Sequence, residues 1–425
     1  MKEEHKMRYQ APKGMEDYYA EQKAVQQKIF NVFRDVATRY GYLEVDTPAM
    51  ESFAILSAKS GEEIKQQIFM IEKRGSEELG LRFDLTVPIT RMFVSRQKEL
   101  VKPVKWFSIG PMWRYEAPQK GRLREFSQLS VEMFGSDRPE ADAELLNLII
   151  DIMKGLGLTD KDFFIKINNR KLLEGILLTA IKKEQLEEVT RVIDKKNKLT
   201  DEEFEQELLD LGLDNFKIQR IRHAIQFNGK PSKVLKEIRK HFADIPEETK
   251  AGITEMVNIC SLVDERYVVL DLSVARGLAY YTGTVFEVFD KQEKFRSMAG
   301  GGRYDQMVEL FGGEKCPATG FAIGEAVTTL VLKECNKLPE PELEPDYFIA
   351  IVSDDVRPDA LKLAQKLRKK YKVDTDLMGR KLKKQFDYAN SISAKKVIVV
   401  GPDEVKAKQF TVKDMKTGKE EKKKF

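Results

Sequence analysis

The chain has 425 residues, 42% of them hydrophobic, which is enough for two or three domains with substantial cores. No run of about 18 apolar residues occurs and the first residues are charged, so we expect no membrane span, no signal segment and a cytoplasmic location. Three widely spaced cysteines (Cys260, Cys316 and Cys335) argue against a zinc-ligand spacing or a disulfide framework and fit a reducing compartment.

The net charge of +4 is unevenly distributed along the chain. Residues 346–425 hold 21 Lys and Arg against 12 Asp and Glu, whereas the rest of the chain is slightly acidic. A basic terminal domain favours the docking of a polyanion at that end. A Lys-rich, solvated surface would give the same count, so both interpretations stay open on charge alone.

The first predicted elements are a helix and a strand. Residues 17–40 carry apolar side chains at helical spacing, and Gly41 is a suitable place for the helix to end. Residues 43–48 predict a strand. By themselves these residues describe an ordinary helix–strand packing unit.

The stretch Leu81–Arg91 carries two polar side chains two positions apart, Asp84 and Thr86. In a strand both would face the same side, where a carboxylate could bind an ammonium group beside a hydroxyl. The alternative is a helix start in which Thr86 is the N-cap, because Val87 and Pro88 follow it.

Two apolar runs, 104–109 and 126–134, flank a turn region and predict a hairpin around a basic loop. We expect Arg114 and Glu116 to share a face of the first strand. On the second strand one face takes Glu125, Ser127, Leu129 and Val131, and the other takes Phe126, Gln128, Ser130 and Glu132.

The hairpin loop offers groups suited to a nucleotide. The guanidinium groups of Arg114, Arg122 and Arg124 suit phosphate oxygens, and the ring of Phe126 could stack on a purine. A solvated strand face with an ion pair between Arg114 and Glu116 is the alternative.

Further along, we expect a helix over 137–154, a strand over 163–168 and a helical segment from about 170 to 262. Strands return over 267–289. There Arg276 could neutralise a developing phosphate charge, and Tyr280 and Tyr281 could close a small pocket. A hairpin with a solvent-exposed arginine and core tyrosines is the alternative.

The last part of the chain begins with the glycine-rich stretch 300–305 and the stretch 319–332, followed by a Pro/Glu-rich linker at 338–345. Strands and helices then alternate up to residue 400, which predicts a parallel sheet. The three histidines, His5, His223 and His241, lie outside every motif and are interpreted as incidental.

Taken in order, these motifs resemble those of the histidyl-tRNA synthetase family, a class IIa group of aminoacyl-tRNA synthetases, in its archaeal and eukaryotic type. The resemblance is carried by Arg-Tyr-Glu followed by Arg-Glu-Phe-Ser-Gln (motif 2), by Arg-Gly-Leu-Ala-Tyr-Tyr-Thr-Gly and by Gly-Gly-Gly-Arg-Tyr-Asp. The helix and strand at 17–48 resemble motif 1, which forms the dimer interface in that family, so a homodimer is implied.

The resemblance implies an α+β fold: an antiparallel catalytic sheet flanked by helices and carrying a helical insertion, plus an α/β anticodon-binding domain. The implied boundaries are a catalytic core with motifs 1 and 2 (1–169), a helical insertion (170–262), the remaining catalytic core (263–337), a linker (338–345) and the anticodon-binding domain (346–425).

The resemblance also assigns residues to ligands. Those assigned to histidine are Asp84, Leu85, Thr86, Gln128, Glu132, Tyr280 and Tyr281. Those assigned to ATP are Arg114, Glu116, Arg122 and Phe126, with Arg114 and Arg276 as catalytic residues. Those assigned to tRNA are Arg380, Lys381, Lys383 and Lys384.

Two positions depart from the family pattern. Val327 stands where motif 3 has the arginine that grips the ATP γ-phosphate, and Ala279 stands where many members have an aspartate that shapes the histidine pocket. The first departure predicts weaker ATP binding unless another cation substitutes.

The implied activity is MgATP-dependent conversion of histidine to histidyl-adenylate, followed by transfer to tRNA(His). Such catalysis needs no protein nucleophile and works by positioning and electrostatic stabilisation. The main alternative is the non-catalytic, histidine-binding regulatory paralogue that activates ATP phosphoribosyltransferase. A third is a tRNA-binding protein with a decayed active site.

Overall fold

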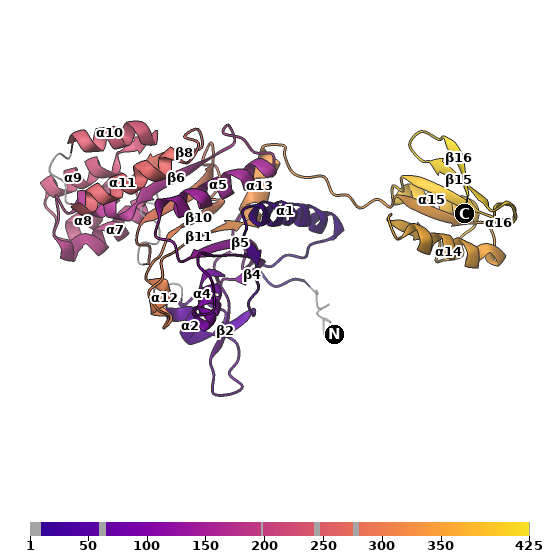
Figure 1. The fold of residues 1–425 in the computed structure, drawn as a ribbon, viewed down its shortest axis with the longest axis horizontal. Coiled ribbons are helices and arrows are strands. Elements are labelled where there is room, and N and C mark those ends of the chain that lie inside the picture. The colour runs from indigo at the N-terminus through magenta and orange to yellow at the C-terminus, as the bar shows by residue number, and fades with distance from the viewer. Residues whose placement is uncertain (1–9, 59–64, 197–198, 242–246, 275–279, 425) are drawn as a thin grey trace, which may run out of the picture. The chain divides into compact units, whose positions relative to one another are not determined.

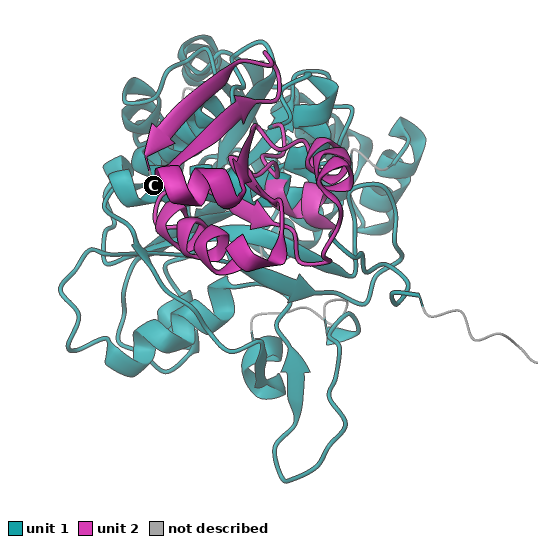
Figure 2. Cartoon of the chain, turned by 90° about the vertical axis from the view of Figure 1, so that its right-hand side faces the viewer, with its two compact units in different colours: residues 1–18, 25–339 teal, residues 19–24, 340–425 magenta. Residues whose placement is uncertain are grey.

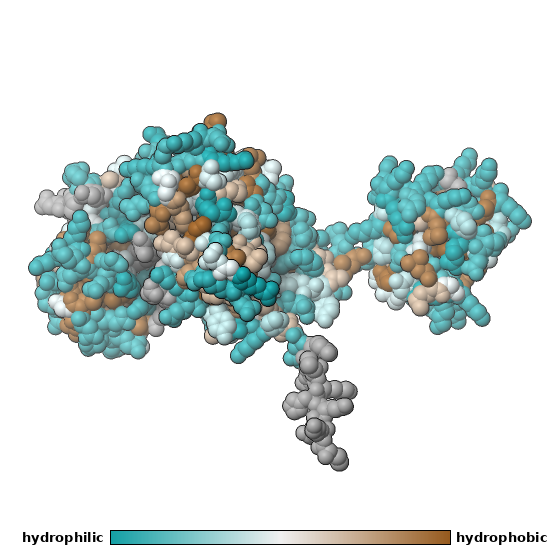
Figure 3. All heavy atoms as spheres, turned by 90° about the horizontal axis from the view of Figure 1, so that it is seen from below, coloured by the Kyte–Doolittle hydropathy of each residue, from teal (hydrophilic) through white to brown (hydrophobic). Residues whose placement is uncertain are grey.

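The computed structural model describes residues 10–58, 65–196, 199–241, 247–274 and 280–424. Two compact units make up the chain: residues 1–18 with 25–339, and residues 19–24 with 340–425 (Figure 2). None of the described helices is long and apolar enough to cross a membrane. Figure 3 shows smaller groups of hydrophobic residues among hydrophilic ones on one face of the molecule.

A nine-stranded sheet dominates the described part of the first unit (Figure 1), in the order β1-β4-β5-β11-β10-β9-β6-β8-β7. The pairs β1–β4 and β6–β8 are parallel and the others antiparallel, as expected for the catalytic sheet. The strands are β1 (Leu43–Glu44), β4 (Val104–Trp113), β5 (Glu125–Phe134), β6 (Phe163–Asn169), β7 (Asn228–Gly229), β8 (Val268–Asp271), β9 (Thr284–Asp290), β10 (Ala299–Arg303) and β11 (Ala318–Gly324). A separate pair joins β2 (Met50–Ser52) to β3 (Leu79–Leu81).

One face of this sheet is held to helix α5 (Pro139–Gly155) by a buried polar network. Asp142 accepts hydrogen bonds from Arg303 Nε at 3.0 Å and from Thr319 Oγ1 at 2.7 Å. Arg303 and Thr319 face each other across β10 and β11, so both point to the α5 side. Because side chains alternate along a strand, the neighbouring residues point to the opposite face.

That opposite face is partly covered by helix α4 (Thr86–Arg96). Phe93 of α4 stacks on Phe134 of β5 with ring centroids 4.3 Å apart. The face extends along β5 to Gln128 and Glu132, which have the same alternation as Phe134. Helix α13 (Glu325–Glu334) contacts β5 and β11 of this sheet, α2 (Phe53–Ala58) contacts β2 and β3, and α12 (Met307–Leu310) contacts α4.

Helix α1 (Ala20–Arg39) buries Ile29, Phe33 and Val36, as its apolar spacing predicted. The strand predicted at 43–48 was too long, since β1 spans only Leu43–Glu44. Val45 still donates a hydrogen bond to the Phe107 carbonyl at 2.8 Å. Pro48 has no N–H group, so the chain cannot continue the ladder through that residue.

In its described residues, the segment predicted to be helical consists of helices and their connections, apart from the short strand β7. Its helices are α6 (Arg170–Leu177), α7 (Leu186–Lys195), α8 (Asp201–Asp210), α9 (Asn215–Ile225), α10 (Pro231–His241) and α11 (Glu247–Ser261), with a 3-10 turn at Lys183–Gln185. The buried apolar side chains of these helices belong to the same hydrophobic core as those of the nine-stranded sheet. The helices therefore pack as part of the first unit.

The second unit contains a five-stranded sheet in the order β13-β12-β14-β15-β16. Its strands are β12 (Tyr347–Ile351), β13 (Val373–Thr375), β14 (Lys396–Val400), β15 (Gln409–Asp414) and β16 (Glu420–Lys424). Its helices are α14 (Arg357–Leu367), α15 (Leu382–Ser391) and α16 (Pro402–Ala407), with a 3-10 turn at Asp354–Val356.

In this unit β12, β13 and β14 are parallel, as predicted, but the hairpin of β15 and β16 was missed. Strand β16 reads Glu-Glu-Lys-Lys-Lys and is exposed throughout. It carries no apolar alternation, so only its backbone pairing with β15 defines it as a strand.

Candidate active site

Glycines on the strands beside β5 leave room for its polar side chains. Gln128 lies between Gly110 of β4 and Gly324 of β11, and Glu132 lies beside Gly320 of β11. A Cβ atom at Gly320 would lie 2.1 Å from Glu132 Oε2, so no other residue fits there without displacing the carboxylate. On the open face of the sheet, the polar side chains of Gln128 and Glu132 are therefore flanked by glycines of the neighbouring strands.

The Glu132 carboxylate is held in place from two sides. It is 1% exposed and accepts hydrogen bonds from Ser130 Oγ at 2.9 Å and from the Tyr304 hydroxyl. A carboxylate has about four acceptor positions, so an oriented Glu132 can still accept a hydrogen bond from a ligand N–H group. Sequence reasoning missed Tyr304 as a site residue, although it belongs to the glycine-rich motif.

Gln128 has an unused acceptor. Its side-chain oxygen is buried and accepts no hydrogen bond from the described residues. Buried polar atoms in folded proteins normally have partners. An amide oxygen in this position would suit an ammonium group of a bound ligand.

Two tyrosines border the same surface. The ring centroids of Tyr280 and Tyr281 are 4.2 Å apart, and those of Tyr280 and Tyr304 are 6.3 Å apart. Tyr281 is 6% exposed, and its Cδ1 would lie 3.0 Å from a Cβ atom at Gly302. The tyrosines are thus brought together with Glu132 through Tyr304.

The predicted catalytic residue Arg276 and the departing residue Ala279 lie outside the described residues. The role of Arg276 therefore stays a prediction.

The segment with Asp84 is a helix start and not a strand, so the shared strand face predicted for Asp84 and Thr86 is wrong. Thr86 is the first residue of α4, and buried Leu85 precedes it. The predicted cap at Thr86 is also wrong, because the Asp84 carboxylate accepts the Val87 N–H at 3.1 Å. A carboxylate near a helix N-terminus is stabilised by the helix dipole.

Arg114 and Glu116 lie beyond the end of β4 at Trp113, so the strand face predicted for them is wrong. The hairpin ladder stops because the N–H of Arg124 bonds to the Gly14 carbonyl at 2.7 Å. Arg114 Nε donates to the Phe83 carbonyl at 3.0 Å, and its guanidinium carbon lies 5.1 Å from the Phe126 ring centroid. Arg114 thus joins the hairpin to the segment that carries Asp84.

The loop beyond Arg114 contains another arginine, Arg122, which is bound to an acidic side chain. Arg122 Nε donates to the Glu116 carboxylate, so Glu116 has an ion-pair partner in Arg122. Arg124 Nε donates to the Glu116 carbonyl at 3.0 Å, and its guanidinium lies 4.2 Å from the Tyr115 ring centroid. Polyphosphate could compete with Glu116 for Arg122, since both offer oxygen acceptors.

The residues predicted to contact tRNA lie around the start of α15. Arg380 forms an ion pair with buried Asp376 at 2.9 Å and lies 4.3 Å from the Tyr388 ring centroid. Burial alone would raise the pKa of the Asp376 carboxyl, but hydrogen bonds from Arg380 hold that pKa below its usual value. Lys381, Lys383 and Lys384 are exposed, whereas the ion pair with Asp376 holds the Arg380 side chain within its own unit.

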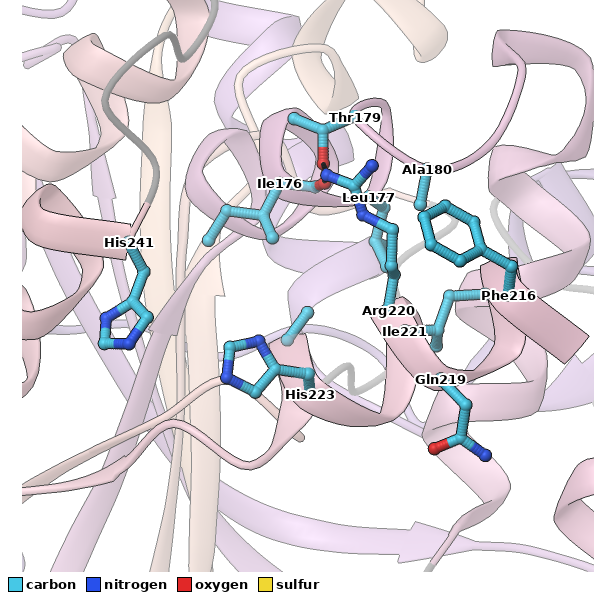
Figure 4. A pocket seen from close by; sticks show the side chains of 11 residues that line it. Ile176, Leu177, Thr179, Ala180, Phe216, Gln219, Arg220, Ile221, His223 and His241 are labelled. Carbon is cyan, nitrogen blue, oxygen red and sulfur yellow. Dashed lines mark hydrogen bonds between the residues drawn. The ribbon is translucent and has the colours of Figure 1, made fainter.

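A cavity of about 320 Å³ lies elsewhere, among the helices of the 170–262 segment (Figure 4). His223 and His241 border it with ring centroids 5.7 Å apart, and Arg220 donates to Thr179 Oγ1 at 3.2 Å. This cavity contains none of the residues predicted for histidine or ATP, so it is separate from the candidate site.

The close contact at Gly320 gives a stability prediction. Changing Gly320 to Ala should lower the free energy of unfolding by roughly 2–3 kcal/mol, because the added methyl group overpacks the strand. Its Cβ would meet the Val131 carbonyl at 2.5 Å as well as Glu132. Urea denaturation measures the change. Gly75→Ala is the matched control, since a Cβ there meets nothing within 4 Å, and equal stabilities of the two variants would contradict the prediction.

Comparisons with known proteins agree on one family. The family model for histidyl-tRNA synthetase matches residues 14–326, and that for an anticodon-binding domain matches residues 346–425. The histidine–tRNA ligase of Haloarcula marismortui is 36% identical over 97% of this chain and 95% of its own length. That of Pyrococcus furiosus is 36% identical over 96% and 95%. The crystal structure of the histidyl-tRNA synthetase from Nostoc sp. PCC 7120 has a TM-score of 0.83 and 26% identity, covering 99% of this chain and 97% of that one.

Proposed function

The chain belongs to the histidyl-tRNA synthetase family, and its relatives are named histidine–tRNA ligases. We propose that it has the same activity and that the open sheet face around Gln128 and Glu132 is its active site. There, a histidine carboxylate oxygen attacks the α-phosphorus of ATP, pyrophosphate leaves, and histidyl-adenylate forms. The 3′-terminal hydroxyl of tRNA(His) then attacks the carbonyl carbon, and AMP leaves.

Histidine binding is assigned to two groups of side chains. Gln128 and Asp84 receive the α-ammonium group, which is supported by the unused buried acceptor of Gln128. Glu132 receives an imidazole N–H, with Tyr280 and Tyr281 beside it. Leu85 and Thr86 shape the pocket next to Asp84.

ATP binding is assigned to the hairpin. Arg114 lies where the strand ends and would hold the α-phosphate, while Arg122 would exchange Glu116 for the outer phosphates. Phe126, whose ring lies beside the Arg114 guanidinium, would stack on adenine. Arg276 would stabilise the charge that develops on the α-phosphate.

Mg²⁺ would arrive with ATP. Among the described residues no group of three or more His, Cys, Asp or Glu side chains is placed to hold a metal ion. Mg²⁺ commonly binds through substrate phosphates, water and one or two carboxylates, so the residues present fit an ion carried by the nucleotide. Bound there, it supplies charge neutralisation of the phosphates.

The remaining assignments concern assembly and tRNA. A homodimer through the motif 1 region is supported by exposed apolar residues around the sheet edge: Leu43 is 66% exposed and Met50 51%. Lys381, Lys383 and Lys384, with Arg380, would contact the tRNA backbone.

We keep the domain boundaries 1–169, 170–262, 263–337, 338–345 and 346–425, and a cytoplasmic location.

The regulatory paralogue is less well supported. The missing motif 3 arginine at Val327 favours it. Against it, the curated relatives named histidine–tRNA ligase align over 97% of the chain, and residues 346–425 match an anticodon-binding domain.

Histidine-dependent exchange of pyrophosphate into ATP, measured without tRNA, tests the proposed site chemistry. Exchange would establish adenylate formation and show that Val327 is tolerated. Bound histidine without exchange would overturn the assignment of adenylate chemistry to this site. Binding of tRNA would then separate a decayed synthetase from a regulatory protein.

A further inference from the structure

Arg82 lies two residues before Asp84, and its guanidinium group is buried beside the end of β4. The side chain is 4% exposed. Its Nε donates to the Pro111 carbonyl at 3.1 Å, and its Nη1 donates to the carbonyl and hydroxyl oxygens of Thr47. The third nitrogen, Nη2, donates to none of the residues that the structure describes. One donor of a buried cation therefore lacks an acceptor among them.

The charge of Arg82 is only weakly balanced by the protein itself. Its acidic partner among the described residues is Asp46, which lies 3.4 Å from Nη1 and is 81% exposed. An exposed carboxylate is screened by water and contributes little. A buried charge is costly unless it is paired and hydrogen-bonded. An anionic ligand would supply both the missing acceptor and the missing charge.

A glycine places this nitrogen on the sheet face of the proposed histidine site. A Cβ atom at Gly110 would lie 2.6 Å from Arg82 Nη2, so the nitrogen occupies the space that a side chain at position 110 would fill. Gly110 of β4 pairs with Gln128 of β5, and paired residues project to the same face. Arg82 Nη2 therefore lies on the face that carries Gln128 and Glu132.

Two more buried polar atoms on this face lack partners among the described residues. They are Gln128 Oε1 and Ser108 Oγ. Ser108 is two positions from Gly110 along β4, so both residues project to the same face, and Ser108 is 1% exposed. An unused donor, an unused acceptor and a hydroxyl thus belong to neighbouring residues. Because buried polar atoms normally have partners, this arrangement indicates a ligand that both accepts and donates hydrogen bonds.

The main chain of a free amino acid has this combination of groups. Its ammonium group donates, which suits Gln128 Oε1, and its carboxylate accepts and carries the charge that Arg82 needs. The carboxylate must also lie near the α-phosphate of ATP in order to react with it. Arg114, which is proposed to hold that phosphate, donates to the carbonyl of Phe83, the residue after Arg82, at 3.0 Å.

We propose that Arg82 is a further histidine-binding residue, whose Nη2 donates a hydrogen bond to the α-carboxylate of the substrate. The inference rests on the histidine site proposed above. Arg82 would hold one carboxylate oxygen, and the other oxygen would attack the α-phosphorus. Because the other nitrogens of the guanidinium are fixed by Pro111 and Thr47, the donor is preorganised.

A comparison of histidine with histidinol, in which an alcohol replaces the carboxylate, tests this contact. In equilibrium titrations the wild-type chain should bind histidine more tightly than histidinol. Arg82→Lys keeps the charge but lacks the fork that places a donor at Nη2. We expect its Kd for histidine to rise about 10- to 100-fold, the loss of a hydrogen bond between charged groups. Its Kd for histidinol should change by less than about threefold, since no such bond is lost.

Gly110→Ala tests the same contact without altering Arg82, because the added Cβ would displace Nη2. It should also weaken histidine binding and spare histidinol binding, and it decides the question if Arg82→Lys does not fold. Arg303→Lys is the matched control. Arg303 is another buried arginine, 5% exposed, and pairs with Asp142 on the opposite face of the sheet. This variant should leave the ratio of the two Kd values unchanged, even if its melting temperature falls.

Several results would overturn the assignment. Equal wild-type affinity for histidine and histidinol, or an unchanged Kd for histidine in the variants, would show that Nη2 does not bind the carboxylate. An equal rise of both Kd values would mark a purely structural role. A rise in the Kd for ATP alone would assign Arg82 to a phosphate instead. Absence of pyrophosphate exchange in the wild-type chain would overturn the proposed function, whereas these titrations need no turnover and still decide on Arg82.

Discussion

Replacing Arg114 with alanine is expected to slow histidine-dependent pyrophosphate exchange by roughly 10²–10³-fold, the usual loss when one donor to a developing charge is removed. Arg114 is fixed at the strand end by its hydrogen bond to the Phe83 carbonyl at 3.0 Å. It is therefore preorganised and loses little freedom when ATP binds. The loss should appear in kcat as well as in the KM for ATP.

The control for this variant is Arg138→Ala. Arg138 is an exposed arginine that pairs with Glu140 at 3.2 Å and lies outside the proposed site. Exchange in Arg138→Ala should stay near the wild-type rate. If Arg114→Ala were to keep exchange within about fivefold of wild type, far less than one such donor normally contributes, the phosphate role of Arg114 would be wrong.

Glu132→Gln is expected to raise the KM for histidine by roughly 10- to 100-fold, with a much smaller change in the KM for ATP. The substitution keeps the side-chain size but removes the charge, and a hydrogen bond to a charged group contributes about 1.5–3 kcal/mol. The effect should be large because Glu132 is 1% exposed, so water cannot replace the lost interaction.

Tyr304→Phe should also raise the KM for histidine more than the KM for ATP, but by a smaller factor than Glu132→Gln, because it removes a hydroxyl that orients Glu132. Glu140→Gln is the matched control, an exposed acid on α5. Steady-state exchange at varied histidine and varied ATP measures both constants. A Glu132→Gln variant with an unchanged KM for histidine would disprove the imidazole contact.

Periodicity and turn residues were sufficient for much of the fold. Helix α1, helix α5, strand β5 and the parallel part of the second unit follow from side-chain spacing that is readable along the chain. The resemblance of local motifs to the histidyl-tRNA synthetase family then supplied the antiparallel character of the catalytic sheet and the residues that we propose for the site.

Spacing failed where a hydrogen-bond partner, near or distant along the chain, decides the backbone structure. The ladder after Trp113 stops because Gly14 takes the Arg124 N–H. Asp84 is a helix cap because its carboxylate reaches the Val87 N–H. Strand β16 exists only through its pairing with β15. Each outcome depends on which hydrogen-bond partner is nearest in space.

By itself, the sequence determined the family of the protein and, through it, the reaction and the side chains that we propose, because those follow from local motifs. Only the tertiary structure decided which partners those side chains have: Glu132 with Tyr304, and Glu116 with Arg122. The physical reason is that a carboxylate in a buried site takes the donors that packing brings to it, and these two donors lie 6 and 172 positions away along the chain.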